Sequence, residues 1–445
     1  MSNALKKCEK KMKIAFHYLG CRLNEAENEQ SARAFVEAGH RIVSIDEHPD
    51  VILLNTCGVT AEAMRKSRNY ARRMATYRPR LLVLMGCAID LMASGENPLD
   101  DAELRESFGE NATDPLEIIR ILRPDRPQVA RIVLEAIDRM EEAQTNETTP
   151  VYPLRMRSFI KVQDGCNNKC SYCAVRLARG PERSEPTEAV LSEIRKCLDL
   201  GEREIVLTGV QVGGWREGNR RLCDLVADIL AKTDVKRLRL SSIEPWHLRP
   251  ELWALWRDRR LCPHFHVPVQ SGSDAVLVAM RRRTPIGGYL EKIHAIRSEI
   301  AGARISTDLI VGFPSEDETM WAQTLDFIQR AQFDSVHLFR FSARPGTDAA
   351  AMPHQIPAEL KRKRWYEAES LIREIQRRRL EACVGASGLV LWESAVKKLG
   401  SRVLWQGYSE NYLQYNRWFD ESDIQRGDIT CEKFGTEDIE ANCVI

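Results

Sequence analysis

The stretch SFIKVQDGCNNKCSYC, residues 158–173, decides how the whole chain is interpreted. It begins with a short apolar run, which is typical of a strand buried on both faces of a parallel sheet. Three cysteines follow with the spacing C-x3-C-x2-C, at Cys166, Cys170 and Cys173. A loop with this spacing can wrap three thiolates around one corner of a cubane iron–sulfur cluster. The fourth iron of such a cluster is then open to a substrate.

A structural zinc site is the main alternative for these three cysteines. His264 or His266 could supply the fourth ligand that a closed zinc site requires. Such sites favour cysteine pairs with the spacing C-x2-C. Buried cysteines that bind nothing are the remaining possibility. The spacing therefore favours an iron–sulfur cluster.

The segment from about residue 152 to residue 340 alternates between strand and helix patterns. Besides the run at Ser158–Val162, its apolar strand candidates are Glu204–Val210, Arg237–Ser242, His264–Val269, Ile305–Gly312 and Ser335–Phe341. Helical segments such as Thr187–Leu200 and Glu318–Ala331 separate them. Six such units in about 190 residues predict a partial (β/α)6 barrel rather than a closed eight-stranded one.

Three further cysteines follow predicted strands nearer the N-terminus. The apolar runs are Lys13–Gly20, Val51–Thr56 and Leu81–Gly86, and the cysteines after them are Cys21, Cys57 and Cys87. In an open parallel sheet, the carboxyl ends of the strands line one crevice. We therefore expect the three thiols to converge, although a single cysteine after a strand is more often a core residue.

These patterns predict an α/β protein with four parts. We expect a small parallel-sheet α/β domain over residues 11–125 and a linker over 126–151 that contains a helix, Pro127–Ala143. The barrel domain should cover residues 152–382 and end with the charged helix Ala358–Cys383. Residues 383–445 contain strand-like runs separated by turn residues and predict a small all-β barrel.

The composition is that of an ordinary globular protein. Of the 445 residues, 43% are hydrophobic and 29% are charged, and the formal net charge is +1. No run approaches the ~20 apolar residues that a membrane-spanning helix needs, and the first residues lack the apolar stretch of a secretory signal. We expect a cytoplasmic protein whose thirteen cysteines are reduced.

The motif at Cys166, Cys170 and Cys173, with Tyr172 before the last cysteine, resembles the signature of the radical S-adenosylmethionine enzymes. The resemblance implies that these cysteines hold a 4Fe–4S cluster whose open iron binds S-adenosylmethionine. One electron from a reduced flavodoxin- or ferredoxin-like donor then cleaves this cofactor to a 5′-deoxyadenosyl radical. In such enzymes the cofactor carries the difficult chemistry and the protein orients it.

The N-terminal motifs narrow this resemblance. The segments YLGCRLNEAE (18–27), LLNTCGVT (53–60) and LLVLMGC (81–87) look like the N-terminal domain of the methylthiotransferases. The resemblance implies that Cys21, Cys57 and Cys87 hold a second 4Fe–4S cluster, which takes part in delivering sulfur. The resemblance to the methylthiotransferases covers about residues 13–430. It is weakest over residues 88–150, and we infer nothing from that region.

The barrel motifs are similar to one branch of that family. They include AVRLARGPERSEP (174–186), HVPVQSGSDAVLVAMRR (266–282) and FRFSARPGT (339–347). This branch methylthiolates C2 of N6-threonylcarbamoyladenosine at position 37, next to the tRNA anticodon. Two hypotheses compete with it: the same chemistry on isopentenyladenosine in tRNA or on an aspartate of a ribosomal protein, and a non-catalytic RNA-binding protein with structural zinc.

Several residues besides the cysteines are expected to bind the cofactor. Most lie at strand ends, where barrel enzymes place their sites: Tyr172, Thr208, Gly209, Ser242, Glu244, Gln270 and Asp308. The alternative for each is turn chemistry, in which glycine permits positive φ and serine or aspartate caps a helix. His17, Trp246 and His337 are expected to be core or rim residues.

Cations and aromatic residues predict the RNA contacts. The segment RKSRNYARRMATYRPR (65–80) contains seven Lys or Arg, two tyrosines and no acid, which suits phosphate binding but also a solvated helix face. The tail motif QGYSENYL (406–413) resembles the small RNA-binding TRAM barrel of this family, whose tyrosines could stack on bases or fill the barrel core. The expected RNA-binding residues are Arg65, Lys66, Arg68, Arg179, Arg183, Tyr408 and Tyr412. The expected partner is the anticodon stem-loop of tRNA, with neither DNA nor a membrane involved.

Overall fold

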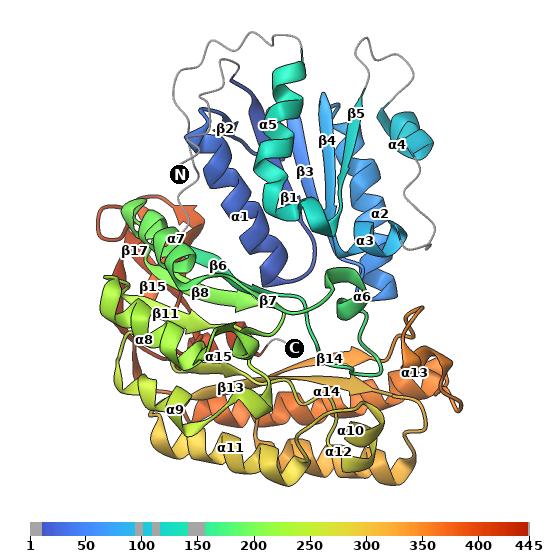
Figure 1. Ribbon diagram of the computed structural model, residues 1–445. Coiled ribbons are helices and arrows are strands. Elements are labelled where there is room, and N and C mark those ends of the chain that lie inside the picture. Colours follow the sequence, from blue (N-terminus) through green and yellow to red (C-terminus); the bar gives the residue numbers. More distant parts are fainter. Residues whose placement is uncertain (1–10, 94–100, 109–115, 141–155, 444–445) are drawn as a thin grey trace. The chain divides into compact units, whose positions relative to one another are not determined.

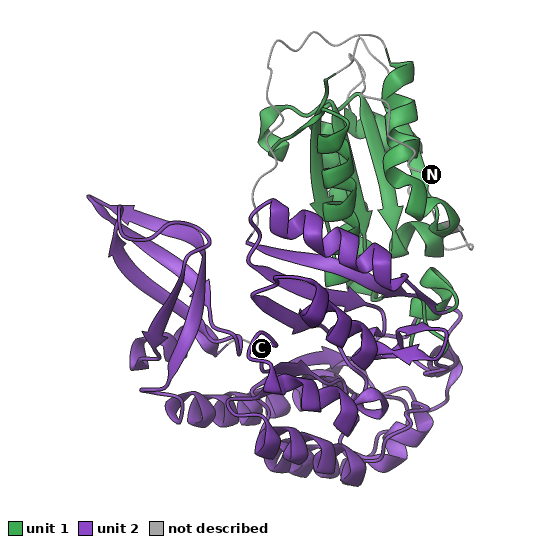
Figure 2. Ribbon diagram, turned by 60° about the vertical axis from the view of Figure 1, so that its left-hand side comes forward, with its two compact units in different colours: residues 1–154, 165–167, 173–181 green, residues 155–164, 168–172, 182–445 purple. Residues whose placement is uncertain are grey.

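The computed structural model of the chain describes residues 11–93, 101–108, 116–140 and 156–443 (Figure 1). The chain separates into two units, which Figure 2 shows in different colours. The first contains residues 1–154, 165–167 and 173–181, and the second contains residues 155–164, 168–172 and 182–445. Cys8 and residues 141–151 of the expected linker lie outside the described residues.

A five-stranded parallel sheet forms the centre of the first unit, in the order β2-β1-β3-β4-β5. The strands are β1 (Lys13–Tyr18), β2 (Arg41–Ile42), β3 (Val51–Thr56), β4 (Leu81–Gly86) and β5 (Glu117–Ile121). Every residue of β3 and β4 is buried, as expected of apolar strands with helices on both faces. The three strands expected from the apolar runs are therefore confirmed. Thr56 pairs with Gly86, so β3 and β4 end level with each other.

Helices cover both faces of this sheet (Figure 1). The helices of the first unit are α1 (Arg22–Glu37), α2 (Ala61–Thr76), α3 (Cys87–Ala93), α4 (Asp101–Phe108), α5 (Val129–Arg139) and α6 (Val175–Arg179). One core joins Phe35 of α1 and Val133 of α5 to Ile14 and Leu53 of the sheet. The other core holds Met74 of α2 and the apolar residues of α3 and α4.

Residues 116–140 differ from the expectation in two respects, because they contain a strand that was not expected and a helix, expected in the linker, that packs into the core. β5 pairs in parallel with β4, and Val133 and Ile137 of α5 are fully buried in the core of the first unit. β5 has the sequence EIIRI and is a short, half-buried edge strand, so its apolar signal is weak. Residues 129–139 of the expected linker are thus a core helix of the first unit.

The second unit contains a partial barrel of six parallel strands. These are β6 (Arg157–Asp164), β8 (Glu204–Gly209), β11 (Arg237–Leu240), β12 (His264–His266), β13 (Arg304–Val311) and β14 (Ser335–Arg340). They pair as β11-β8-β6 and β12-β13-β14, and single bridges from Leu238 to Leu261 and from Ser242 to His266 connect the two groups. The expected partial (β/α)6 barrel is confirmed.

The connections of the barrel are mainly helices. They are α7 (Thr187–Asp199), α8 (Leu222–Lys232), α9 (Pro250–Trp253), α10 (Asp274–Ala279), α11 (Ile286–Glu299), α12 (Glu318–Ala331), α13 (Asp348–Ala351) and α14 (Ala358–Glu381). The connections also contain three short strands, β7 (Arg183–Ser184) before α7 and β9 (Arg216–Glu217) and β10 (Arg220–Arg221) before α8. Within the described residues, the 3-10 turns are η1 (Ile45–Glu47), η2 (Arg123–Gln128), η3 (Val212–Gly214), η4 (Pro245–His247), η5 (Ala254–Arg257) and η6 (Thr436–Asp438). Among the described helices, none is long and apolar enough to cross a membrane.

The C-terminal segment forms an antiparallel half-barrel, which confirms the expected all-β tail. Its strands β15 (Ser387–Leu399), β16 (Arg402–Tyr408), β17 (Gln414–Asp420) and β18 (Ile429–Lys433) lie in the order β17-β16-β15-β18, and α15 (Ile439–Asn442) follows. Its core contains Trp392, Tyr415 and Phe434. This small core is separate from the larger core of the barrel.

A buried charge cluster attaches the half-barrel to the amino-terminal end of the barrel strands. Glu204, which is fully buried, lies 2.8 Å from Arg157, 2.8 Å from Arg237 and 2.9 Å from Arg239. Arg237 also donates to the carbonyl of Leu389 (2.7 Å). Burial alone would raise the pKa of Glu204, but the three guanidinium groups hold that pKa well below its ordinary value. The carboxylate is therefore charged and joins three barrel strands to the C-terminal segment.

We expect Glu204→Gln to lower the free energy of unfolding by about 3–5 kcal/mol, because it leaves buried arginines without their counter-charge. Denaturant unfolding of the purified protein measures this change. The control is Glu421→Gln, which removes an exposed ion pair with Lys398 and should change stability by less than about 1 kcal/mol. Equal effects of the two variants would contradict the anchoring role of Glu204.

Candidate functional site

Three cysteines of the first unit gather at the carboxyl ends of its central strands. Cys57 follows β3 and Cys87 follows β4; both are buried, whereas Cys21, just before α1, is exposed. Gly20, at φ +100°, lies so close to Cys57 that an added Cβ would be 2.7 Å from the Cys57 Cβ. Only glycine permits both this φ and this approach. The turn after β1 therefore places Cys21 beside the ends of β3 and β4.

The three thiols influence one another electrostatically. The pKa of the Cys57 thiol is raised to about 11, mainly by burial and also by the neighbouring Cys87 and Cys21, whereas a backbone hydrogen bond with Val59 and the charge of Arg179 lower it. Ser67 of α2 holds the backbone of Cys57 from both sides, since its hydroxyl accepts from the Cys57 N–H (3.0 Å) and donates to the Cys57 carbonyl (2.8 Å). Three cysteine side chains from separate strand ends therefore lie together and could ligate one metal centre as thiolates.

A polar network surrounds this trio. The Asn24 amide donates to the carbonyls of Leu19 (2.7 Å) and Thr56 (3.1 Å), so it ties α1 to the turn after β1 and to the end of β3. The Asn55 amide donates to Glu27 (3.1 Å). Asn24 and Glu27 are buried side chains of α1. They are three positions apart and therefore share one face of the helix.

Arg179 enters the same network. Its Nε lies 3.3 Å from the Cys87 Sγ, and its NH1 lies 2.9 Å from Glu27. Arg179 was expected to contact RNA, but its side chain is only 2% exposed and its charge is matched by a buried carboxylate. That expectation has to be revised, because the arginine faces the cysteines of the first unit instead of solvent.

The loop with the other three cysteines connects β6 to α6. Cys166, Cys170 and Cys173 are all partly exposed. In the first unit, the Cys166 N–H donates to the Gly180 carbonyl (3.0 Å), and Gly165, at φ +70°, would place a Cβ 2.0 Å from the Pro181 carbonyl oxygen. The beginning of the loop is therefore held against the segment that follows α6, by backbone contacts that exclude a side chain at Gly165.

The middle of the loop is held within the second unit. The Ser171 N–H donates to the Met280 carbonyl (3.2 Å) and its hydroxyl donates to the Ala279 carbonyl (2.8 Å). Tyr172 packs against a small apolar cluster that includes Phe313 and Phe341. In this structure Tyr172 therefore serves to fix the loop, whereas its contact with a cofactor stays a prediction.

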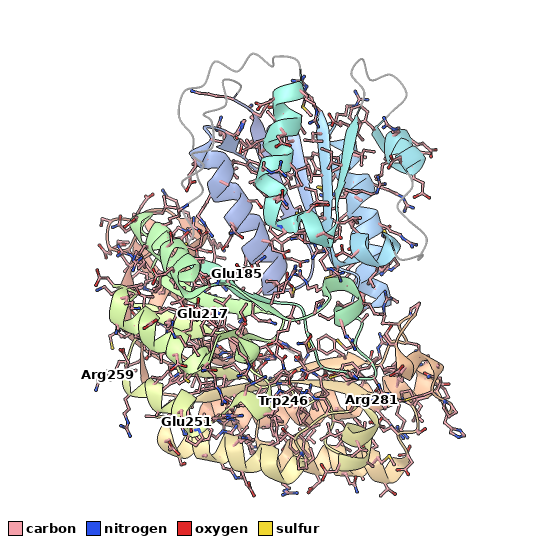
Figure 3. The ribbon with its side chains drawn as sticks, in the orientation of Figure 1. Glu185, Glu217, Trp246, Glu251, Arg259 and Arg281 are labelled. Atoms are coloured by element: carbon pink, nitrogen blue, oxygen red, sulfur yellow. The ribbon has the colours of Figure 1, made fainter. Side chains whose placement is uncertain are left out.

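Arg282 contacts this loop. Its NH1 lies 3.9 Å from the Cys170 Sγ and 3.1 Å from Glu244, and its NH2 donates to the Pro268 carbonyl (2.7 Å). Trp246, labelled in Figure 3, stacks on the Arg282 guanidinium at 4.8 Å. Glu244, expected at the cofactor, therefore orients an arginine that faces a cysteine of the motif.

The remaining expected cofactor residues lie at the carboxyl ends of barrel strands. Thr208 and Gly209 end β8, and a Cβ on Gly209 would be 2.7 Å from the Gln163 carbonyl oxygen. Ser242 forms a bridge with His266. Gln270 has φ +84° and exchanges backbone hydrogen bonds with Asp308 and Ile310 (2.9 Å each). These positions fit a barrel site, and their contacts with a cofactor stay predictions.

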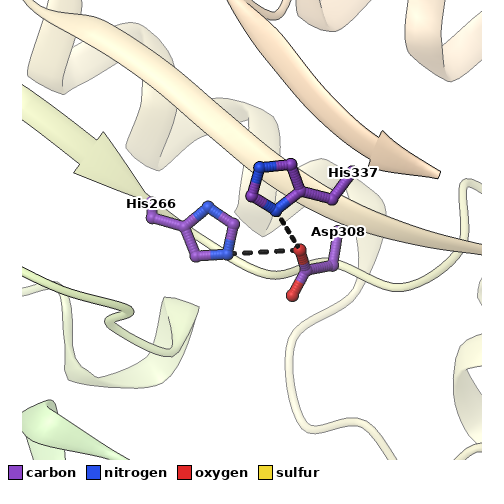
Figure 4. A group of neighbouring side chains, drawn as sticks. All are labelled: His266, Asp308 and His337. Carbon is purple, nitrogen blue, oxygen red and sulfur yellow. Dashed lines mark ion pairs between the residues drawn. The ribbon is translucent and has the colours of Figure 1, made fainter. Parts of the chain in front are cut away.

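Asp308 forms a group with two histidines from the neighbouring strands (Figure 4). One carboxylate oxygen lies 3.3 Å from His266 Nε2 and 3.2 Å from His337 Nδ1, and His266 Nδ1 lies 2.9 Å from the Ser306 hydroxyl. Burial would raise the pKa of Asp308, but the hydrogen bonds and charges of the two imidazoles hold it well below its ordinary value. The three ligand atoms lie within 4.8 Å of one another, so the group could hold a divalent ion. The Asp308 carboxylate also has both histidines as partners when no ion is bound.

The expected RNA-binding residues have different environments. Arg65 and Lys66 of α2 are exposed, and Lys66 pairs with Glu62 (2.9 Å). Arg68 is partly buried, and Arg183 is exposed near Asp164 (3.8 Å). The exposed cations of α2 remain suitable for phosphate contacts.

Tyr408 and Tyr412, the two tyrosines of the C-terminal segment, contact arginines of the barrel. The Tyr412 ring stacks on Arg239 (3.9 Å), and its hydroxyl accepts from Arg157 (3.1 Å). Tyr408 stacks on Arg157 (5.4 Å). These rings are used within the second unit, and their stacking on RNA bases stays a prediction.

Sequence reasoning missed the residues that surround the cysteines. These are Asn24, Glu27, Asn55 and Ser67 in the first unit and Arg282 in the second. Two of these residues could have been found from the sequence. Asn24 and Glu27 follow Cys21 by three and six positions, a spacing that places them on one face of the helix that begins there. Of the cysteines left without a role, Cys197 and Cys262 are buried and Cys431 is exposed, whereas Cys223, Cys383 and Cys443 are intermediate.

Two family models match the chain. Residues 160–328 match the Radical SAM superfamily, and residues 13–99 match the Uncharacterized protein family UPF0004. The threonylcarbamoyladenosine tRNA methylthiotransferase MtaB of Bacillus subtilis is 30% identical over 90% of this chain and 89% of its own length. The enzyme of the same name from Thermotoga maritima is 32% identical over 90% of both chains.

Another relative and a solved structure extend the comparison. The tRNA-2-methylthio-N(6)-dimethylallyladenosine synthase of Desulfosudis oleivorans is 34% identical over 86% of this chain and 83% of its own length. The radical S-adenosylmethionine methyltransferase TsrM from Kitasatospora setae has a TM-score of 0.56 at 13% identity and covers 76% of this chain and 77% of its own. At that identity, the likeness concerns the fold alone.

Proposed function

The chain belongs to the radical S-adenosylmethionine tRNA methylthiotransferases, and from this premise we propose that it methylthiolates C2 of N6-threonylcarbamoyladenosine at position 37 of tRNA. Two relatives that match nearly the whole chain bear the name of that activity, and the barrel motifs resemble the same branch. The family's members are enzymes, so a zinc-containing, non-catalytic RNA-binding protein is set aside.

The observation that carries the proposal is that one chain contains two groups of three cysteines, each in contact with a buried arginine. Cys87 lies 3.3 Å from Arg179, and Cys170 lies 3.9 Å from Arg282. Three thiolates leave one iron of a 4Fe–4S cluster open. Donors aimed at the ligating sulfurs offset the charge that the thiolates bring. Both groups of side chains therefore fit iron–sulfur clusters.

The family's cofactors are a 4Fe–4S cluster and S-adenosylmethionine, and we assign that cluster to Cys166, Cys170 and Cys173. When bound, this pair supplies a carbon-centred radical that can react at an unactivated C–H bond. We assign a second 4Fe–4S cluster to Cys21, Cys57 and Cys87, as the site that delivers sulfur. A reduced flavodoxin- or ferredoxin-like protein is the proposed electron donor.

The chain's own residues would position these groups. Arg282 orients the loop at Cys170, and Glu244 and the Pro268 carbonyl fix that arginine. Gly209, Ser242 and Gln270 lie at strand ends where a bound nucleoside cofactor can be contacted by backbone and hydroxyl groups. The exposed cations of α2 and the C-terminal half-barrel are the proposed contacts for the anticodon stem-loop of tRNA.

Mass spectrometry of tRNA nucleosides tests the substrate. A strain without this gene should contain N6-threonylcarbamoyladenosine and no 2-methylthio derivative of it, and the wild-type gene should restore the derivative. A Cys166→Ala gene serves as the control that should not restore it. If the deletion instead removes 2-methylthio-isopentenyladenosine, or leaves all tRNA nucleosides unchanged, the substrate assignment is wrong.

A further inference from the structure

Arg179 is the buried arginine of the first unit that contacts Cys87. It is the last residue of α6 and follows Cys173 by six positions. α6 lies against α3, the helix that begins at Cys87. The chain segment that leaves one cysteine motif therefore delivers a cation to the other motif within a single unit.

The partners of Arg179 determine the direction in which it donates. NH1 pairs with Glu27 at 2.9 Å, and NH2 donates to the Asn24 side-chain oxygen at 2.7 Å. These contacts fix the plane of the guanidinium, and its Nε–H is then directed at the Cys87 Sγ at 3.3 Å. The Asn55 amide holds the Glu27 carboxylate at 3.1 Å. The donor is therefore preorganised by three side chains, two from α1 and one from the end of β3.

The acceptor is chemically suited to a metal-bound state. A neutral thiol is a weak acceptor, whereas a thiolate is a charged one, and charge-assisted hydrogen bonds are about twice as strong as neutral ones. The guanidinium is delocalised and always charged, so it keeps its donor in any state of the sulfur. An ion pair with Glu27 alone would not require Nε to face Cys87.

We propose that Arg179 is a positioning residue for the cluster at Cys21, Cys57 and Cys87, which holds the Cys87 thiolate and stabilises the reduced form of that cluster. This inference rests on the proposed second cluster. Hydrogen bonds to the sulfur ligands are among the features that set iron–sulfur potentials. Groups that orient metal ligands commonly change metal affinity when they are replaced. Arg179 thereby ties the second cluster to the segment that begins at Cys173.

The test uses the full chain with Cys166, Cys170 and Cys173 replaced by alanine, so that only the second cluster can form. In this background, Arg179→Gln should release iron to a chelator about 10–100-fold faster and should shift the midpoint potential to a more negative value, because a donor to the thiolate is lost. Arg176→Gln, an exposed arginine of the same helix, is the matched control and should change neither quantity.

A second variant separates positioning from folding. The double variant Glu27→Gln/Arg179→Gln removes both buried charges and therefore leaves no unpaired carboxylate in the core. It still lacks the hydrogen-bond donor to Cys87. We expect its apo form to unfold at a temperature near that of the control, and its iron release to stay fast. If the double variant restores slow iron release and the original potential, Arg179 only balances Glu27 and the inference is overturned.

The iron content of the alanine background distinguishes an error about the second cluster from an error about the role of Arg179. If the alanine background binds no iron after anaerobic reconstitution, the second cluster itself is wrong. If the background binds about four irons and Arg179→Gln matches Arg176→Gln in release rate and potential, the cluster stands and the role of Arg179 is wrong.

Discussion

Replacement of Cys166, Cys170 and Cys173 by alanine is expected to abolish the formation of 5′-deoxyadenosine and to lower the iron content from about eight to about four per chain. The physical reason is that, under the proposed assignment, these thiolates would hold the cluster whose open iron would bind S-adenosylmethionine for reductive cleavage. Without the three thiolates, the barrel would hold neither the proposed cluster nor the cofactor bound to it. Iron analysis and chromatography of the reductive cleavage products measure both effects.

The control for this variant is Cys431→Ala, which removes an exposed cysteine of β18 that has no proposed role. It should retain full iron content and full cleavage. Retention of about eight irons by the triple variant, or unchanged 5′-deoxyadenosine production, would show that these cysteines do not hold the radical cluster.

Cys87→Ala is expected to separate the two halves of the reaction. Cleavage of S-adenosylmethionine should continue, because the radical cluster is intact, whereas the methylthiolated nucleoside should fall below detection. Under the proposed assignment, only Cys21 and Cys57 would remain to hold the second cluster, and two thiolates would be too few. Single-turnover assays with anticodon stem-loop RNA, followed for 5′-deoxyadenosine and for the product nucleoside, measure the two activities in one sample.

The matching control is Cys197→Ser, which changes a buried cysteine of α7 in the barrel core. It tests whether the loss of a buried thiol alone removes the product. A Cys87→Ala enzyme that still forms the methylthiolated nucleoside would exclude the N-terminal trio as the sulfur-delivering site.

The fold was predictable wherever the local pattern is strong. β3 and β4 are uninterrupted apolar runs whose residues are all buried, and such runs predict parallel strands with little ambiguity. β5 was not predicted, because EIIRI is a short edge strand with only one buried residue. Its identity depends on pairing with β4 across more than thirty residues of chain, which no local pattern encodes.

The sequence was enough to predict which cysteines are candidate ligands. It was not enough to predict which side chains surround them. The spacing of Cys166, Cys170 and Cys173 and the positions of Cys21, Cys57 and Cys87 after strands are local features of the sequence. The partners of these cysteines are not local: Arg179 contacts Cys87 across 92 positions, and Arg282 contacts Cys170 across 112. A surface role for Arg179 was a reasonable expectation for an arginine, since unpaired charges are almost never buried.

The sequence by itself determined which thiols are candidates for metal binding, the six βα units of the barrel and the all-β tail, because spacing and periodicity are properties of neighbouring residues. Only the tertiary structure decided what those residues face. It buries Arg179 against Glu27 and Cys87, and it uses Tyr412 to cover Arg239 instead of leaving the ring to solvent. The reason is physical: a buried charge must find its counter-charge somewhere in the fold, and that partner is chosen by packing between distant segments.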